Sequence, residues 1–350
     1  MALADLSHES VNALPEASSP YLYRSQFSVG GISVQVAGFL ACDAVLPPSL
    51  VPFRVPLGLP DVFIAVDRVA QLRACSPPLV FDSDTTWILY AGERSLQFDF
   101  EAAMFGERPF KRLFVDESFA TATLQISEQC QALLGHAVEP LGYPLDELLI
   151  MHRLTQEKAI ELHGTGIVRP NGEANLFVGH SGAGKSTTTR LWTATEEVEV
   201  LSDDRIIVRR DKGAGANRGM DGAANRLGIL QLRETSASLS SRFFQDDKPK
   251  SKIRMYGTPW HGEAMFASPN SAPLTRIFVL EHGHGNVITP LSPSQAVAEL
   301  FARSFVPFHR HEYVESALVF LEELVDVIPV YRYAFEPDQR AVDKILHFHD

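Results

Sequence analysis

Residues 174–187 read ANLFVGHSGAGKST, in which an apolar segment is followed by a glycine-rich segment and then by residues compatible with a helix. Residues 179–187 of this stretch satisfy the pattern G-x-x-x-x-G-K-[ST]. Glycines in this pattern permit backbone conformations that direct successive N–H groups at phosphate oxygens, and the helix that follows adds its positive amino-terminal end. Because the pattern lies between a predicted strand and a predicted helix, the sequence predicts a loop that binds the phosphates of a nucleoside triphosphate; a glycine-rich turn that fits by chance is the alternative.

The predicted phosphate loop contains one cation and one hydroxyl at defined positions. Lys185 is expected to reach the outer phosphates, and the Ser186 hydroxyl is expected to bind the magnesium ion that accompanies ATP or GTP. His180 occupies a free position of the pattern, where a solvated loop residue is commoner than a proton donor. The residues predicted to hold the nucleotide are Gly179, His180, Ser181, Gly182, Ala183, Gly184, Lys185, Ser186 and Thr187.

Two adjacent acids, Asp203 and Asp204, follow the short run 198–201, eighteen residues (203 − 185) after Lys185. One helix and one short strand fit into this interval, so the acids are expected at a strand end beside the phosphate loop. Two neighbouring carboxylates can divide the work of phosphoryl transfer, one holding magnesium and the other accepting the proton of the attacking hydroxyl. The alternative is an acidic pair that opens a surface turn with Arg205 as its ion-pair partner.

Two further residues are candidates for the same site. His163 lies on the predicted strand 159–168, which leads through a turn at 170–172 into the phosphate loop, and it is expected to contact Asp203 and tune its basicity. Arg254 opens the string RMYGTPWHGE (254–263), where it is expected to neutralise charge on the transferring phosphate while Trp260 forms a wall of the site. A structural histidine, and a buried aromatic in a turn with a surface arginine, are the competing interpretations.

The rest of the chain divides into an arm at 1–20, a mostly β region at 21–141 and a second domain at 142–350. Alternating apolar patterns predict the strands of the β region, and helical spacing at 145–156 predicts a helix that joins the two halves. The segment 211–226 is expected to be a mobile loop. The strands predicted in the first half are 32–36, 62–66, 86–90, 95–100 and 122–126. The elements predicted in the second half are strands at 159–168, 174–178, 198–201, 205–209, 276–280 and 330–335 and helices ending near 195, at 294–304, at 312–327 and near the terminus.

Composition limits the partners and the compartment. A formal net charge of −12 argues against binding to nucleic acid or to anionic lipid, and no segment approaches the roughly 18 apolar residues of a membrane span. Three separated cysteines are too few to cross-link a chain of 350 residues, and the first twenty residues lack a basic stretch before an apolar run. We therefore expect an unprocessed cytoplasmic protein; self-association into a homo-oligomer stays open.

The order of motifs resembles a known family. Leu162-His163-Gly164, the hairpin, GHSGAGKST and Leu201-Ser202-Asp203-Asp204 together resemble the catalytic domain of HPr kinase/phosphorylase and its kinase-like relatives, which share a nucleotide-binding core with ATP-dependent phosphoenolpyruvate carboxykinase. The resemblance is specific over about residues 145–210 and covers about half the chain. It implies an α/β fold in which a P-loop core with a mixed sheet follows a mostly β (α+β) domain.

The resemblance also implies roles for the site residues. Gly179 to Thr187 would hold the triphosphate, Ser186 and Asp204 the magnesium, and Asp203 would be the base that acts on a serine hydroxyl, with His163 nearby. The two aspartate roles are exchangeable. The glycine-rich signature with Glu and Arg that follows the acidic pair in HPr kinases is not found in this chain, so the resemblance does not extend to HPr as the acceptor.

The sequence therefore favours a kinase that moves the γ-phosphate of ATP to a hydroxyl of a peptide, a protein or a small metabolite. A phosphotransferase like phosphoenolpyruvate carboxykinase would need additional basic groups around a second metal, and no convincing set is present. A third interpretation is a nucleotide-binding regulator or scaffold that retains the pocket without the reaction, against which the intact acidic pair argues.

Overall fold

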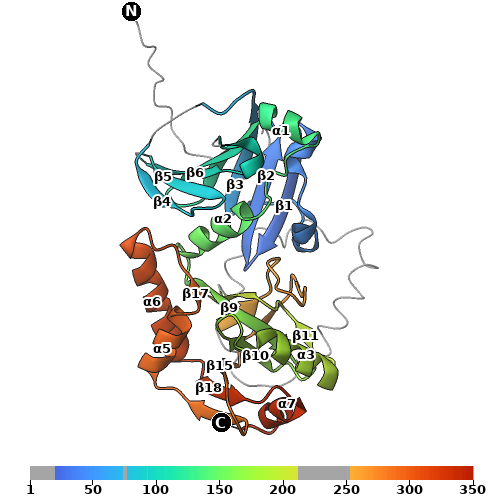
Figure 1. Ribbon diagram of the computed structural model, residues 1–350, viewed down its shortest axis with the longest axis vertical. Coiled ribbons are helices and arrows are strands. Elements are labelled where there is room, and N and C mark those ends of the chain that lie inside the picture. The colour runs from blue at the N-terminus through green and yellow to red at the C-terminus, as the bar shows by residue number, and fades with distance from the viewer. Residues whose placement is uncertain (1–19, 74–76, 93, 107, 212–252, 350) are drawn as a thin grey trace, which may run out of the picture.

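The computed structural model describes residues 20–73, 77–92, 94–106, 108–211 and 253–349. The chain folds into two mixed sheets, one at each end of the molecule, and the helix α2 (Leu145–Leu154) lies between them (Figure 1). The expected α/β character is confirmed in this form. The predicted arm at 1–20 lies outside the described residues except for Pro20, and the predicted loop at 211–226 lies outside them except for Asp211.

The first sheet has eight strands in the order β1-β2-β3-β8-β7-β6-β5-β4. Neighbouring strands are antiparallel except where β3 pairs with β2 and with β8. Alternate residues of β3 and β8 are buried, as expected for a sheet with one face on the core. The strands are β1 (Tyr23–Val29), β2 (Ile32–Gly38), β3 (Val62–Val69), β4 (Leu79–Asp82), β5 (Trp87–Ala91), β6 (Ser95–Phe100), β7 (Lys111–Asp116) and β8 (Thr121–Ser127).

All five strands predicted in this region are confirmed, and β1, β4 and β7 were not predicted. Short helical elements accompany the sheet. They are the 3-10 helices η1 (Ala41–Ala44), η2 (Pro48–Phe53) and η3 (Ala103–Phe105), and the α-helix α1 (Glu128–Leu134).

The second sheet has its main path in the order β14-β13-β12-β9-β10-β15-β18-β16, with two short strands, β11 and β17, also paired to β9. β10 runs parallel to β15 and antiparallel to β9, so the sheet is mixed. The strands are β9 (Ala159–Val168), β10 (Ala174–Val178), β11 (Glu199–Val200), β12 (Arg205–Arg210), β13 (Ile253–Tyr256), β14 (Ser271–Pro273), β15 (Arg276–His282), β16 (Val287–Pro290), β17 (Ser304–Phe305) and β18 (Val330–Phe335).

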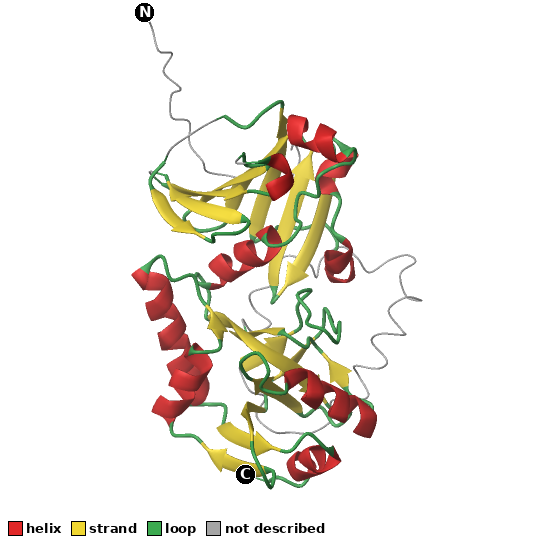
Figure 2. Ribbon diagram, viewed as in Figure 1, coloured by secondary structure: helices red, strands yellow, loops and turns green. Residues whose placement is uncertain are grey.

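Helices cover both faces of the second sheet (Figure 2). On β10, Leu176 belongs to the apolar cluster that includes α5 (Pro293–Phe301) and α6 (His311–Val325), whereas Phe177 belongs to the cluster that includes α3 (Lys185–Thr195) and α7 (Gln339–Leu346). Successive side chains of a strand point to opposite faces, so β10 is covered on both sides. Residues 179–187, the predicted phosphate loop, follow this buried strand directly. Among the described residues, no helix is both long enough and apolar enough to cross a membrane.

Contacts between the two halves are polar as well as apolar. Arg209 on β12 donates to the Gly30 carbonyl in the turn between β1 and β2, at 2.8 Å. Lys111 on β7 is buried and donates to the carbonyls of Pro140 and Gly142, just before α2. The Lys111 bonds hold the segment just before α2 against the first sheet, and Glu147 of α2 reaches the candidate site described next.

Candidate functional site

The phosphate loop joins β10 to α3, as predicted, and its last glycine has a strict steric requirement. Gly184, the residue before α3, has φ +101°, and a Cβ at this position would lie 2.4 Å from Phe335 Cζ. Only glycine adopts this positive φ readily and also leaves room for the Phe335 ring. No side chain caps the start of α3, so the first N–H groups of this helix lack an intrahelical partner and a side-chain acceptor at the helix cap. Such N–H groups suit an anion.

Lys185 lies inside this loop. Its side chain is buried, and Nζ donates to the carbonyl oxygens of Gly179 and His180 at 3.0 and 3.2 Å. Burial lowers the pKa of Lys185, while the charge of Asp204 acts to raise it. On the other side of the loop, His282 Nε2 lies 2.7 Å from the Gly182 carbonyl oxygen, a contact that the sequence analysis did not predict.

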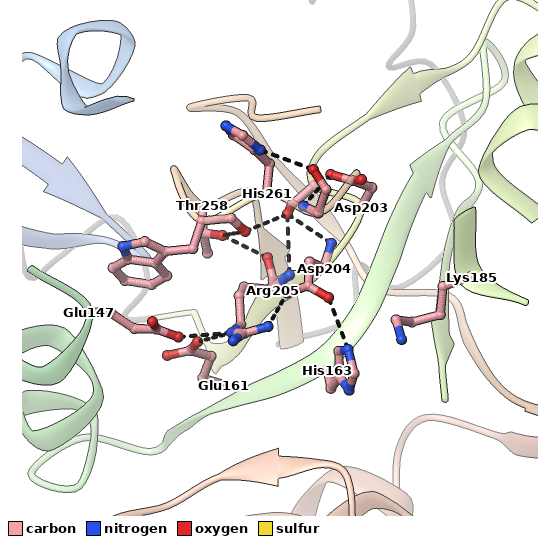
Figure 3. Close-up of polar contacts among 12 residues, drawn as sticks. Glu147, Glu161, His163, Lys185, Asp203, Asp204, Arg205, Thr258 and His261 are labelled. Atoms are coloured by element: carbon pink, nitrogen blue, oxygen red, sulfur yellow. Dashed lines mark hydrogen bonds and ion pairs between the residues drawn. The ribbon is translucent and has the colours of Figure 1, made fainter. Parts of the chain in front are cut away.

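Asp204 and His163 form a pair beside Lys185. His163 on β9 is the register partner of Arg205 on β12, which brings the residue before Arg205 to the histidine ring. His163 Nε2 lies 2.9 Å from Asp204 Oδ1, and the Arg205 guanidinium contacts Asp204 Oδ2. Figure 3 shows Asp204 and His163 pointing toward each other, with Arg205 on one side and Lys185 on the other.

The pKa of Asp204 follows from these neighbours. Burial alone would raise the pKa, but the hydrogen bond with His163 and the positive charge of Arg205 outweigh burial, and the net shift is downward. The carboxylate is therefore ionised at neutral pH. About a quarter of its side chain is exposed, so a ligand can approach it.

Asp203 has a different environment from Asp204. Its side chain is buried, and its two oxygens accept three backbone N–H groups, from Gly262 at 3.0 Å, Ala264 at 2.8 Å and Phe266 at 3.2 Å. We expected His163 to contact Asp203, and the histidine contacts Asp204 instead. Of the two acids, Asp204 faces the phosphate loop, and Asp203 holds the segment 262–266.

Arg205 is surrounded by carboxyl groups. Besides Asp204, its Nε lies 2.8 Å from Glu147 Oε1 on α2 and 3.5 Å from Glu161 Oε1 on β9. The guanidinium also lies over the Phe305 ring, 4.1 Å from its centroid. Burial and the charge of Glu147 raise the pKa of Glu161 well above its usual range, although the charge of Arg205 opposes this shift. The sequence suggested Arg205 only as a surface ion-pair partner, and it is instead partly buried between α2 and β9.

Arg254 and Trp260, both predicted in or beside the site, point elsewhere. The Arg254 guanidinium donates to the hydroxyl and carbonyl of Ser271 on β14, within 3.3 Å. The Trp260 indole N–H donates to Asp146 Oδ2 on α2 at 3.0 Å, and the ring packs in the apolar core of the first sheet. Arg254 is the register partner of Arg209, at the end of β12 away from Asp204. The structure therefore does not bring Arg254 to the phosphate loop.

Arg303 is a cation near the loop that the sequence analysis missed. Its carbonyl oxygen accepts the His163 N–H at 2.8 Å, and its guanidinium donates to Glu299 at 2.5 Å. The charge of Arg303 is the main cause of a lowered pKa at His180, the second residue of the phosphate loop. No local motif marks Arg303, because it reaches the site through the pairing of β17 with β9.

These residues fit a nucleoside triphosphate with magnesium. The uncapped start of α3, Lys185 and the nearby charges of Arg205 and Arg303 suit the phosphates, and the Ser186 hydroxyl and Asp204 are oxygen ligands of the kind that magnesium prefers. Among the described residues, no three His, Cys, Asp or Glu side chains are placed to hold a metal by themselves. A scan against models of protein families gives no match, and a search among curated proteins also gives none.

Proposed function

We propose that this chain is an ATP- and magnesium-dependent kinase of the HPr kinase/phosphorylase-like type, which transfers the γ-phosphate to a hydroxyl group. The observation that carries the proposal is the position of the ionised Asp204, hydrogen-bonded to His163, beside Lys185 of a G-x-x-x-x-G-K-[ST] loop. A base and a phosphate-binding cation at one place are what phosphoryl transfer to a hydroxyl needs.

The residues of the loop would hold the nucleotide. The N–H groups of Gly179 and Ala183 donate to the carbonyls of His163 and His180, and the other N–H groups of the loop would face the phosphates. Lys185 would exchange its carbonyl partners for phosphate oxygens, and Ser186 would bind the magnesium ion. Magnesium in such a site neutralises charge on the transferring phosphoryl group. Arg205 and Arg303 would add positive potential around the loop.

We assign to Asp204 the role of base, which the resemblance gave to Asp203, and Asp203 takes no part in the transfer. Asp203 accepts three backbone N–H groups and has no free approach, whereas Asp204 is partly exposed and faces Lys185. In the proposed step the acceptor hydroxyl loses its proton to Asp204 while its oxygen bonds to the terminal phosphorus. The bond from that phosphorus to the bridging oxygen breaks, and the nucleoside diphosphate leaves. His163 keeps the Asp204 carboxylate oriented toward the hydroxyl.

A second candidate is a nucleotide-binding regulator without transfer activity. One observation favours it. The kinase hypothesis from the sequence needs two aspartates, one for magnesium and one as base, but Asp203 is bound to the backbone of the segment 262–266 and only Asp204 is available. The same loop would bind the nucleotide, and binding would alter the conformation of the protein without transfer of a phosphoryl group to an acceptor.

The two candidates separate in one experiment. Purified protein is incubated with γ-labelled ATP and magnesium, with and without a panel of serine peptides, proteins and hydroxylated metabolites, and Lys185→Met is run in parallel. We expect label on an acceptor, slow release of labelled phosphate to water, and loss of both in the variant. Tight binding of ATP with no label on any acceptor and no release to water would instead establish the regulator.

A further inference from the structure

Residues 261–266, here called the clamped loop, cross over the acidic pair. Gly262 marks the crossing point: a Cβ on this residue would lie 3.0 Å from Asp203 Oδ2 and 3.3 Å from Asp204 Cβ. The clamped loop therefore packs against Asp203 and against the Cβ of Asp204, the residue to which we assign the base role. Figure 3 shows His261, the first residue of the loop, on the Asp203 side of this group.

The clamped loop is fixed at its middle and at both ends. Asp203 binds its backbone through three N–H groups, as described above. Before the loop, Trp260 is anchored to Asp146 on α2; after it, the Ser268 N–H donates to the Leu201 carbonyl at 2.8 Å. A segment ordered in this way loses little conformational freedom when it binds a partner.

The side chains that the clamped loop presents are unusual for a segment held so firmly. His261 and Glu263 are exposed, and Met265 is 70% exposed. Met265 also has φ +59°, a left-handed conformation that side chains other than glycine rarely adopt. Glu263 has no hydrogen bond or ion pair in the part of the chain that the structure describes. Within three residues of Gly262, a fixed loop thus displays to solvent an apolar thioether and a carboxylate that has no partner among the described residues.

We propose that the clamped loop selects the acceptor, and that the acceptor is a polypeptide segment carrying Lys or Arg and an apolar side chain close to its hydroxyl. This proposal rests on the kinase function proposed above. Glu263 pairs with the cationic side chain, and Met265, whose flexible thioether adapts to irregular apolar surfaces, covers the apolar one. The two contacts deliver the hydroxyl to Asp204. A net charge of −12 favours a cationic partner and disfavours anionic metabolites at an exposed glutamate.

The test uses the full chain and arrayed serine peptides of random flanking sequence, with γ-labelled ATP. The variants are Glu263→Lys and Met265→Ala. The matched controls are Glu322→Lys, at an exposed glutamate on α6, and Met104→Ala, at an exposed methionine in η3. We expect the wild type to prefer Lys or Arg at one position and an apolar residue at another. Glu263→Lys removes or reverses the charge preference and raises KM for the best basic peptide by roughly tenfold, with kcat and the KM for ATP unchanged. Met265→Ala relaxes only the apolar preference.

Several results separate this inference from the kinase proposal. Peptide binding is also followed by fluorescence anisotropy without ATP, and ATP turnover in water is followed without peptide. Unchanged peptide preferences in both variants, or transfer to a small hydroxylated metabolite and to no peptide, would overturn the inference and leave the kinase intact. If the protein neither turns over ATP nor transfers label, the kinase proposal is overturned. If it shows no preferential binding to basic peptides in the anisotropy assay, the inference is overturned, whether or not ATP is turned over.

Discussion

Replacing His152 by phenylalanine should make the protein resist acid better than the wild type does. His152 lies on α2, is 1% exposed, and its Nδ1 lies 2.7 Å from the Leu148 carbonyl oxygen. Its ring packs among four aromatic or imidazole rings, those of Phe98, Phe119, His309 and Tyr313. Burial lowers the pKa of His152 from 6.5 to about 3, so the imidazole is neutral in the folded protein over most of the acidic range.

The sign and size follow from linkage. Below pH 6.5 the unfolded chain binds a proton at His152 and the folded protein does not until about pH 3, so stability falls as pH falls through this window. Between about pH 7.5 and about pH 4.5 the loss attributable to this one residue is about 2.5 kcal/mol. Phenylalanine has no such proton to bind, so the variant should lose less stability over the same interval, by an amount on the order of 2 kcal/mol.

The assay is urea unfolding followed by tryptophan fluorescence at both pH values, for the wild type, His152→Phe and the control His311→Phe. The His311 side chain is 88% exposed, so the control should follow the wild type. His309, whose pKa burial also lowers, to about 4, remains in every variant. If His152→Phe and the wild type lose the same stability between the two pH values, the linkage argument for this residue is refuted.

Three further outcomes follow from the site. Glu161→Gln should gain stability relative to the wild type as pH rises above 4.5. The raised pKa keeps Glu161 protonated in the folded wild type while the unfolded chain ionises, so the wild type alone loses stability. Equal pH profiles of the two proteins in chemical denaturation would contradict this. Gly184→Ala should lose ATP binding in calorimetry and about 1–3 kcal/mol of stability, because its methyl group would meet Phe335. The control Gly135→Ala, where φ is +71° and the surroundings are open, should bind ATP normally. Normal ATP binding by Gly184→Ala would count against the loop geometry. Asp203→Asn should lose roughly 1–3 kcal/mol of stability in thermal unfolding, because an amide supplies only one acceptor oxygen for three N–H groups. The variant should also lose peptide selectivity and retain ATP binding. Full retention of stability and selectivity would mean that Asp203 does not hold residues 261–266 in place.

The parts of this fold that short-range patterns encode were predictable. The loop 179–187 and its flanking strand and helix are contiguous in sequence, and the apolar periods of 159–168, 174–178 and 330–335 are long enough to read. β17 has two residues, and β14 has three, so neither has a period to detect. Strand pairing, in contrast to strand identity, depends on contacts between distant residues that no local pattern specifies.

The same distinction explains the candidate site. Adjacent Asp203 and Asp204 look equivalent in sequence, and only the tertiary position of residues 262–266 gives Asp203 its three N–H partners. Arg254 was expected near the phosphates from its place in a motif, but register with Arg209 carries it away. Arg303 joins the site through a two-residue strand more than a hundred residues after the loop (303 − 187 = 116). Each of these assignments depended on topology.

In the proposed reaction Asp204, and not Asp203, takes the proton of the acceptor hydroxyl. The most direct measurement of this role is single-turnover transfer from γ-labelled ATP in Asp204→Asn, with ATP affinity measured on the same preparation. We expect affinity within about threefold of the wild type and a loss of transfer on the order of a hundredfold or more, since general base catalysis of this kind contributes about that much. Transfer at the wild-type rate in Asp204→Asn, with ATP bound normally, would show that Asp204 is not the base.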